Sequence, residues 1–456
     1  MEVVKTLAYK IKNHSKIFDK TIEIYNEALS FIIYVIDQEF DSIGHLSTKS
    51  LVPAVESFIH FTKTNTNPKY KNFDSLFYKY PSYLRRSTIA QAFGIVKSYR
   101  SNLQNWENEK EIAFSQGLLF KKKAPSLQLK HNAFPVFYKD NMFERTSDST
   151  ALIKVFHQND WVWIEIEFKK QDLYKRGVWN WKENNPTLVK VGKKYFLHIS
   201  YESKVKLKKD KIQNIRACNV DLGLTKSAVC SIMDSNGTVL ARKFINQSKE
   251  KDRFATMINK LKKAQHESGK GPKPNFWRRI NGLQDQIVND TAHQIVKFAN
   301  KHGAHVIVFE YLGKMKMPKG IWGARRLRHK LQFWAKMRIQ KKVEQMAHYL
   351  GMRFSRVNAK NTSALAFDGS GEIVRSDRKD LCTFTTGKKY HADLNASYNI
   401  GARYFIREIQ KSTSEKKWLF LQAKAPELAK RTQLTLSSLI SLQQAQESVS
   451  KVPQLV

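Results

Sequence analysis

Residues 217–233, ACNVDLGLTKSAVCSIM, contain two short apolar runs on either side of one carboxylate, Asp221. Residues 217–222 and 228–233 have the length and composition of β-strands. The DSNG tetrapeptide that follows them is a strong hairpin signal, and residues 239–244 supply a third strand. The sequence therefore predicts three consecutive antiparallel strands, with an acidic residue at the end of the first.

The elements after these strands alternate between helix and strand. A long basic helical stretch is interrupted by the Gly- and Pro-rich residues 269–274 and then resumes with apolar residues at helical spacing. The later predicted elements are, in order, a strand at residues 305–309, a helix at 331–350, a strand at 352–357 and a helix from Asp393. Three antiparallel strands followed by helix, strand, helix, strand and helix is the order of a ribonuclease-H-like fold.

Two further carboxylates occupy comparable places in this order. Glu310 ends the fourth strand and Asp393 begins the last helix. Because the fourth strand neighbours the first in such a sheet, we expect Asp221, Glu310 and Asp393 to converge. Carboxylates beside buried strands are costly unless a cation pairs with them, and clustered oxygen ligands suit Mg²⁺. The sequence predicts two Mg²⁺ ions about 4 Å apart, one activating a water and one stabilising the leaving 3′ oxygen in phosphodiester hydrolysis.

Each carboxylate also has an ordinary structural explanation when it is considered singly. Asp221 could be a turn residue, Glu310 a solvated strand end, and Asp393 a helix N-cap. Their joint occurrence in this order, in a strongly basic chain, favours the catalytic interpretation.

The composition indicates a folded protein with a polyanionic partner. The chain has 456 residues, more than one hydrophobic core usually organises. Its 79 Lys and Arg against 40 Asp and Glu give a formal net charge of +39, which favours nucleic acid. An anionic membrane surface is the weaker alternative, since the basic residues are not gathered on one amphipathic helix. Three scattered cysteines and a start without an apolar segment predict a reducing, cytoplasmic setting.

Three segments resemble a known family of nucleases. Residues 219–224 (NVDLGL), 308–312 (VFEYL) and 393–400 (DLNASYNI) are similar to the three RuvC motifs of the TnpB nucleases, relatives of compact type V CRISPR effectors. Weaker likeness extends to residues 186–189 and 83–86. The resemblance implies RNA-guided cleavage of double-stranded DNA beside a short motif that the protein reads. It also implies a guide RNA as partner, with one protein per guide or a dimer, in a prokaryotic cytoplasm and on the nucleoid when bound to DNA.

The resemblance implies an α+β multidomain fold with a ribonuclease-H-like (RuvC) nuclease domain, a helical recognition domain and a small antiparallel β-barrel, the wedge. The expected divisions are a first wedge strand (1–14), the helical recognition domain (15–118), the wedge β-domain (119–205), the RuvC-like core (206–360), a degenerate zinc-ribbon-like insert that binds target nucleic acid (361–390), the third motif with the last helix (391–411), and a peripheral or partly disordered C-terminal extension (412–456).

The insert departs from the family pattern. Ala366 and Gly369 stand where a first pair of cysteines would fall, and Thr385 replaces the partner of Cys382. One thiolate cannot build a four-ligand zinc site, so we expect no structural zinc and an insert held by packing. Arg378 matches the family's Arg-containing segment and is expected to contact the scissile phosphate, because its guanidinium fork fits phosphate. A surface salt bridge is the alternative for Arg378.

Basic and aromatic residues elsewhere are candidates for nucleic-acid contact, although charge runs on helices are often solvated faces. The predicted nucleic-acid-binding residues are Tyr83, Arg85, Arg86, Lys262, Lys263, Arg278, Arg279, Arg325, Arg326, Arg328 and Lys330. Four tryptophans, Trp161, Trp163, Trp179 and Trp181, could stack on nucleotides or pack against a neighbouring element.

Two other functions fit the same sequence. A guide-dependent DNA-binding regulator without cleavage would tend to lose acidic residues, and all three are present. A transposase with the same fold would need no guide RNA, which would leave the β-domain before the nuclease core without a role. RNA that copurifies with the protein would separate these possibilities.

Overall fold

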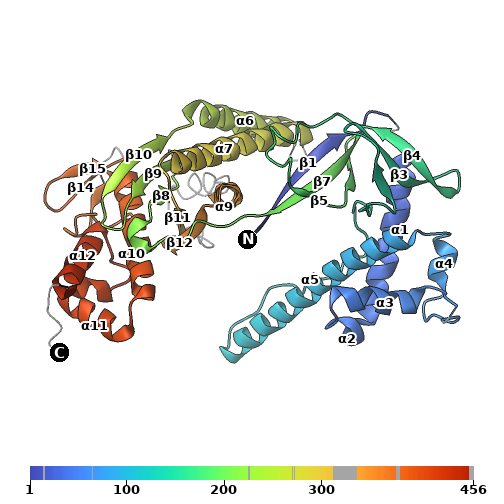
Figure 1. Cartoon of the computed structure of the whole chain (residues 1–456), viewed down its shortest axis with the longest axis horizontal. Helices are drawn as coiled ribbons and strands as arrows, with labels where there is room; N and C mark the ends of the chain where they lie inside the picture. Colours follow the sequence, from blue (N-terminus) through green and yellow to red (C-terminus); the bar gives the residue numbers. More distant parts are fainter. Residues whose placement is uncertain are drawn as a thin grey trace. The chain divides into compact units, whose positions relative to one another are not determined.

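The computed structural model describes all residues except 14, 15, 64, 224, 225, 270, 272, 312–335, 376–379 and 451–456. The chain forms two compact units (Figure 1), residues 2–203 and residues 204–456, the second of which includes Met1. None of the described helices is long and apolar enough to cross a membrane. The finer, seven-part division expected from the resemblance stays a prediction.

The second unit is built on a five-stranded mixed sheet. Its strands are β8 (Ala217–Asp221), β9 (Ala228–Met233), β10 (Val239–Ile245), β11 (Val306–Tyr311) and β12 (Arg353–Asn358). Their order in the sheet is β10-β9-β8-β11-β12; β9 is antiparallel to β8 and β10, and β11 is parallel to β8 and β12. All five strands predicted from the apolar runs are confirmed.

Helices cover both faces of this sheet. They are α6 (Ser248–Glu267), α7 (Pro274–Lys301), α9 (Lys336–Tyr349) and α10 (Ala392–Ser412). Side chains alternate between the faces of a strand, so Val220 and Phe309 pack with α7 and α9, whereas Ala217 and Val308 pack with α10. The sheet therefore separates two apolar layers (Figure 1), which explains the continuous hydrophobic character of β8, β9 and β11.

Helix α10 approaches the sheet closely at a glycine. A Cβ added at Gly401 would lie 2.2 Å from Nδ2 of Asn219 and 2.9 Å from Sδ of Met233. A larger residue would require a shift of the helix or of the buried Asn219 and Met233 side chains. Beside Gly401, the buried hydroxyl of Ser397 lies 3.2 Å from that of Ser231. This close contact between helix and sheet thus fixes the position of α10, including its amino end, relative to β8 and β9.

The C-terminal extension completes the core on the α10 side. It contains α11 (Glu415–Lys424), a 3₁₀ turn η2 (Pro426–Ala429) and α12 (Leu436–Ser450). Arg403 is buried, and its guanidinium donates to the carbonyls of Asn358, Lys360, Thr432 and Leu434 at 2.6–3.0 Å. The helix expected near residues 434–450 is present, and its residues Leu436, Leu439 and Leu442 are buried.

The insert before α10 is a small sheet over an apolar cluster. Its antiparallel strands are β13 (Val374–Arg375), β14 (Leu381–Thr383) and β15 (Lys389–His391). Cys382 is buried with Ala366, Phe384 and Ala392, and the ring of Phe367 lies edge-on to those of Phe384 and Tyr390. Aromatic packing holds this insert together in the described part of the chain.

The first unit combines helices with two sheets. The helices are α1 (Ile17–Gln38), α2 (Phe40–Ile43), α3 (Thr48–Ile59), α4 (Asn72–Leu76) and α5 (Ser82–Ser115). One sheet contains β1 (Glu2–Lys10), β5 (Lys182–Glu183), β6 (Thr187–Val191) and β7 (Lys194–Lys204); the other contains β2 (Phe143–Arg145), β3 (Thr150–His157) and β4 (Asp160–Glu167). The predicted β6–β7 hairpin is confirmed. A β-bridge between Ile11 and Phe168 joins the residues that directly follow β1 and β4. Closure of the two sheets into a barrel stays a prediction.

Candidate active site

Two of the three predicted carboxylates end adjacent strands. In the parallel pair of β8 and β11, Val220 lies opposite Phe309. Asp221 and Glu310 are the next residues, so their side chains leave the sheet on the same face. This is the face that α10 covers, because Val308 and Val357, the latter paired with Glu310, belong to the core layer of α10.

The third carboxylate enters from the start of α10. Asp393 lies in the first turn of that helix. A Cβ added at Gly223 would lie 2.8 Å from the carbonyl oxygen of Lys226 and 3.8 Å from Oδ2 of Asp393. The glycine after Asp221 therefore allows the chain to turn beside Asp393. The structure brings Asp221, Glu310 and Asp393 to one end of the sheet.

The electrostatics of the cluster are unfavourable for ionised acids. Asp221 keeps some exposed surface, but its carboxyl lies deep among protein atoms. Burial raises the pKa of Asp221 well above its usual value, Glu310 and Asp393 raise it further, and Arg375 opposes the shift. Burial also raises the pKa of Glu310, against a hydrogen bond from Thr362 and the charge of Arg403. When ionised, Glu310 and Asp393 therefore repel the carboxylate of Asp221.

The position of Glu310 is set by neutral partners. The hydroxyl of Thr362 donates to Oε1 of Glu310, and Nδ2 of Asn399 holds the carbonyl of Thr362 at 3.0 Å. The backbone carbonyl of Glu310 accepts a hydrogen bond of 3.0 Å from Nε2 of Gln340. Burial lowers the pKa of nearby Arg403 to about 10, and Glu310 opposes that shift. Arg403 thus stays cationic at neutral pH while its donors are engaged with backbone carbonyls.

The three acids differ from many others in the described part of the chain in how they are paired. Among the described residues, none of Asp221, Glu310 and Asp393 forms an ion pair. In the same part of the chain, no three His, Cys, Asp or Glu side chains are arranged so that they could hold a metal ion as they stand. The donor chemistry nevertheless fits a hard divalent cation, since three carboxylate side chains from three elements lie at the same end of the sheet. Binding would require these side chains to turn toward a shared ion.

A lysine beside the cluster was missed from the sequence. Nζ of Lys226 lies 2.7 Å from Nε2 of His391 and 4.6 Å from the ring centre of Phe244. Burial lowers the pKa of His391, and Lys226 lowers it further, so neutral His391 accepts the hydrogen bond from the ammonium group. The available signal was the position of Lys226 in the same short connection as Asp221. It places a cation next to the acids without an ion pair.

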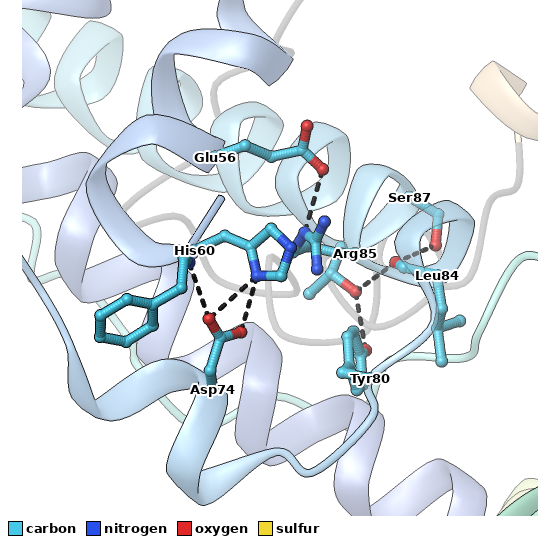
Figure 2. Close-up of polar contacts among 9 residues, drawn as sticks. Glu56, His60, Asp74, Tyr80, Leu84, Arg85 and Ser87 are labelled. Carbon is cyan, nitrogen blue, oxygen red and sulfur yellow. Dashed lines mark hydrogen bonds and ion pairs between the residues drawn. The ribbon is translucent and has the colours of Figure 1, made fainter. Parts of the chain in front are cut away.

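One predicted nucleic-acid-binding residue, Arg85, already has a partner inside the protein. Arg85 is buried, and its Nε donates to Oε1 of Glu56 at 3.0 Å (Figure 2). A phosphate contact would have to break this pair, so Arg85 is a packing residue of α5. Its neighbour Arg86 is exposed and lies 5.0 Å from the ring centre of Tyr83. Tyr83 and Arg86 remain available at the first turn of α5.

The other predicted contacts divide into described and undescribed residues. Lys262, Lys263, Arg278 and Arg279 are exposed on α6 and α7. A cleft of about 670 Å³ lies between these helices, lined on one side by Arg253 and Lys260 and on the other by Arg279. The residues Arg325, Arg326, Arg328, Lys330 and Arg378 lie outside the described part of the chain.

The four tryptophans that the sequence analysis singled out differ in how deeply they are buried. Trp161 is buried and Trp181 packs partly against the core of the first unit. Trp163 and Trp179 are exposed. Only the second two can offer a ring face to a ligand.

This chain is similar to several known proteins and solved structures. A model of the Aq_aa04 family matches residues 5–157. The TnpB-like protein aq_aa05 of Aquifex aeolicus (strain VF5) is 24% identical over 231 residues, which are 46% of this chain and 74% of that protein. The predicted resemblance to the TnpB proteins is confirmed by this relative.

Two solved structures are also similar to this chain. A Cas12f1–sgRNA–target DNA complex matches with a TM-score of 0.46 and 17% identity, covering 85% of this chain and 82% of that one. The mini-RNA-guided endonuclease CRISPR-Cas_phi3 matches with a TM-score of 0.46 and 10% identity, covering 88% and 92%.

Proposed function

We propose that this protein is an RNA-guided DNA endonuclease whose mixed sheet is a ribonuclease-H-like (RuvC) core. Guide RNA would pair with one strand of a double-stranded DNA target, next to a short motif read by the protein. The helices and sheets of the first unit would serve as recognition and wedge regions. The net charge of +39 supports a large polyanionic partner.

The observation that carries the proposal is the cluster of Asp221, Glu310 and Asp393. Three acids from β8, β11 and α10 share one sheet end, where burial and mutual repulsion raise the pKa of Asp221. Such an arrangement costs stability unless it serves a ligand. A purely structural cluster would be expected to include a basic side chain as a counterion.

The three acids would hold Mg²⁺, with two ions expected. When bound, these cations would lower the pKa of water and stabilise the charge that develops on the leaving oxygen. Glu310, held by Thr362, would give the cluster one fixed member, whereas Asp221 and Asp393 would adjust. Lys226 would lie on the phosphate side, and Arg378 is proposed as a second phosphate contact.

The test is cleavage by the complex purified with its own RNA. Sequencing that RNA identifies the guide, and a plasmid library with the matching target and a randomised flank supplies the substrate. We expect Mg²⁺-dependent cleavage that Asp221→Ala abolishes, a loss of about a thousandfold or more because metal binding supplies several kcal/mol. RNA binding should be unchanged in this variant.

A matched control is Asp290→Asn, which removes an exposed acid of α7 in the same unit. It should cleave like the wild type. Guide-dependent binding without cleavage in the wild type would favour the regulator, and cleavage or strand transfer without RNA would favour the transposase. Cleavage by Asp221→Ala at the wild-type rate would refute the assignment of the site.

A further inference from the structure

The segment between β4 and β5 is held in place by buried side chains and backbone hydrogen bonds. Residues 169–182 read KKQDLYKRGVWNWK. Val178 is fully buried, and Leu173 and Trp181 pack against the same core. Backbone hydrogen bonds of 2.8–3.1 Å join Gly177 to Tyr174, Val178 to Leu173 and Trp181 to Val178. Gly177 has φ +68°, a conformation that glycine tolerates best.

This turn displays two large aromatic rings. Tyr174 is 79% exposed and Trp179 is 62% exposed. Their ring centres are 6.3 Å apart with an interplanar angle of 39°. Burying such side chains would contribute favourable free energy that is not realised here. A rigid turn that keeps two rings in solvent indicates a surface that is covered by a ligand.

The charges around the rings identify the kind of ligand. Lys169, Lys175 and Arg176 are exposed, and in the described part of the chain no ion pair involves Lys175 or Arg176. The neighbouring Lys170 pairs with Asp148 at 2.6 Å. Rings combined with unpaired cations are the elements of single-stranded nucleic-acid binding, in which bases stack and phosphates meet Lys or Arg.

We propose that Tyr174 and Trp179 form a stacking platform for unpaired bases of a single-stranded nucleic acid, with Lys175 and Arg176 contacting its phosphates. A protein partner is less favoured because Lys is depleted at protein interfaces, and exposed Lys175 directly follows Tyr174. A membrane is less favoured because the rings lie on a short turn and not on an amphipathic helix. The inference rests on the proposed nucleic-acid partner but not on cleavage.

Photocrosslinking tests the platform directly in the full-length protein. The probes are oligonucleotides of about four nucleotides, within the range of small single-strand sites, that carry 5-iodouracil as the base. One probe is DNA and the other RNA, which distinguishes the two sources of the strand. We expect crosslinks on the tryptic peptides 171–175 and 177–182, which contain Tyr174 and Trp179.

Variants separate stacking from charge. Trp179→Ala should weaken binding to a base-bearing probe by about 5- to 150-fold, the range for loss of one stacked base. It should leave binding to an abasic strand of equal length unchanged, and Trp179→Phe should restore much of the loss. Phe420→Ala is the matched control, since Phe420 is an exposed ring with Lys424 nearby at 5.1 Å, in the other unit. This control should bind both probes like the wild type.

Two results would overturn the proposal. Crosslinks that avoid both peptides, or that persist in the double variant Tyr174→Ala/Trp179→Ala, would show that bases stack elsewhere. Loss of self-association or of vesicle binding in that variant, with both probes bound normally, would assign the rings to protein or membrane. Asp221→Ala should crosslink normally, so failure of the nuclease assignment and failure of the platform remain distinguishable.

Discussion

The ion-paired acids of the first unit contrast with the three clustered acids of the second unit, in which other acids such as Glu344 and Glu408 are also paired. In the first unit, several buried or partly buried acids lie beside basic side chains: Glu56 lies 3.0 Å from Arg85, Asp74 lies 2.8 Å from His60, and Glu183 lies 3.0 Å from both Lys139 and Arg145. Figure 2 shows the first two pairs side by side. In the second unit, Asp221, Glu310 and Asp393 gather without an ion pair among the described residues.

The consequence is a difference in the sign of the pKa shifts. Burial alone would raise the pKa of Glu183, but Arg145 and Lys139 outweigh it and the pKa is lowered. Burial raises the pKa of Asp221, and its neighbours Glu310 and Asp393 reinforce the effect. Burial is therefore shared by both kinds of acid, and charge balance distinguishes them. Acids with an ion-pair partner in the chain need no external cation, whereas the role proposed above for Asp221, Glu310 and Asp393 is to bind one.

The largest effect on stability is expected from breaking an ion pair of the first unit. Glu56→Gln should destabilise the first unit by about 3 kcal/mol, because it leaves the buried guanidinium of Arg85 without an anion. Urea unfolding would measure the loss, and hydrogen exchange should locate it in α3 and α5. Asp148→Asn, which removes an exposed pair with Lys170, should give no measurable change. Unchanged exchange in α3 for Glu56→Gln would mean that the pair does not stabilise the unit.

The unneutralised cluster should respond to divalent cations instead. In nucleic-acid-free protein at matched ionic strength, Mg²⁺ at a hundred times its Kd should stabilise the second unit by about 2.7 kcal/mol. Asp221→Asn should lose this response, and Glu56→Gln should keep it. Thermal unfolding with and without Mg²⁺ provides the measurement. An equal response of the wild type and Asp221→Asn would place the ion elsewhere.

Much of the second unit could be predicted because its signals are local. The strands β8, β9 and β11 are short apolar runs, and strand order alone indicated that Asp221 and Glu310 would be neighbours. The orientation of the three acidic side chains was not predictable from the sequence. The hydrogen bond that orients Glu310 comes from Thr362, which is 52 residues away along the chain.

The features that sequence reasoning missed depend on distant partners. Arg85 looks like a surface cation until Glu56, 29 residues earlier, is placed beside it. The tail looks peripheral until Asn399 and Arg403 bind its backbone. Lys226 belongs to no recognisable sequence motif, and its position is explained only by its hydrogen bond to His391, 165 residues later. In each case the physical role comes from tertiary hydrogen bonding, which periodicity and composition do not encode.

Neutralising one acid should stabilise the metal-free protein. Since the folded pKa of Asp221 is raised above its ordinary value of 3.8, the folded state binds more protons, and its stability falls as the pH rises from that value through the folded pKa. Asp221→Asn removes this loss. The gain should be near zero at about pH 4 and reach about 1–2 kcal/mol at about pH 8, a usual size for a stabilising substitution. Urea unfolding in EDTA measures it, and a gain that is independent of pH would exclude repulsion as the cause.

The smallest effect is expected from the cation beside the cluster. Lys226→Met should reduce cleavage about tenfold at saturating Mg²⁺, equivalent to about 1.4 kcal/mol, because one phosphate-side charge is lost while the acids remain. Lys226→Arg should retain most of the activity, and Lys301→Met, at the exposed end of α7, should cleave normally. Single-turnover cleavage with prebound RNA isolates the step. Wild-type cleavage by Lys226→Met would assign the lysine to packing on Phe244 and His391, and the contrast between the two units would then rest on the three acids alone.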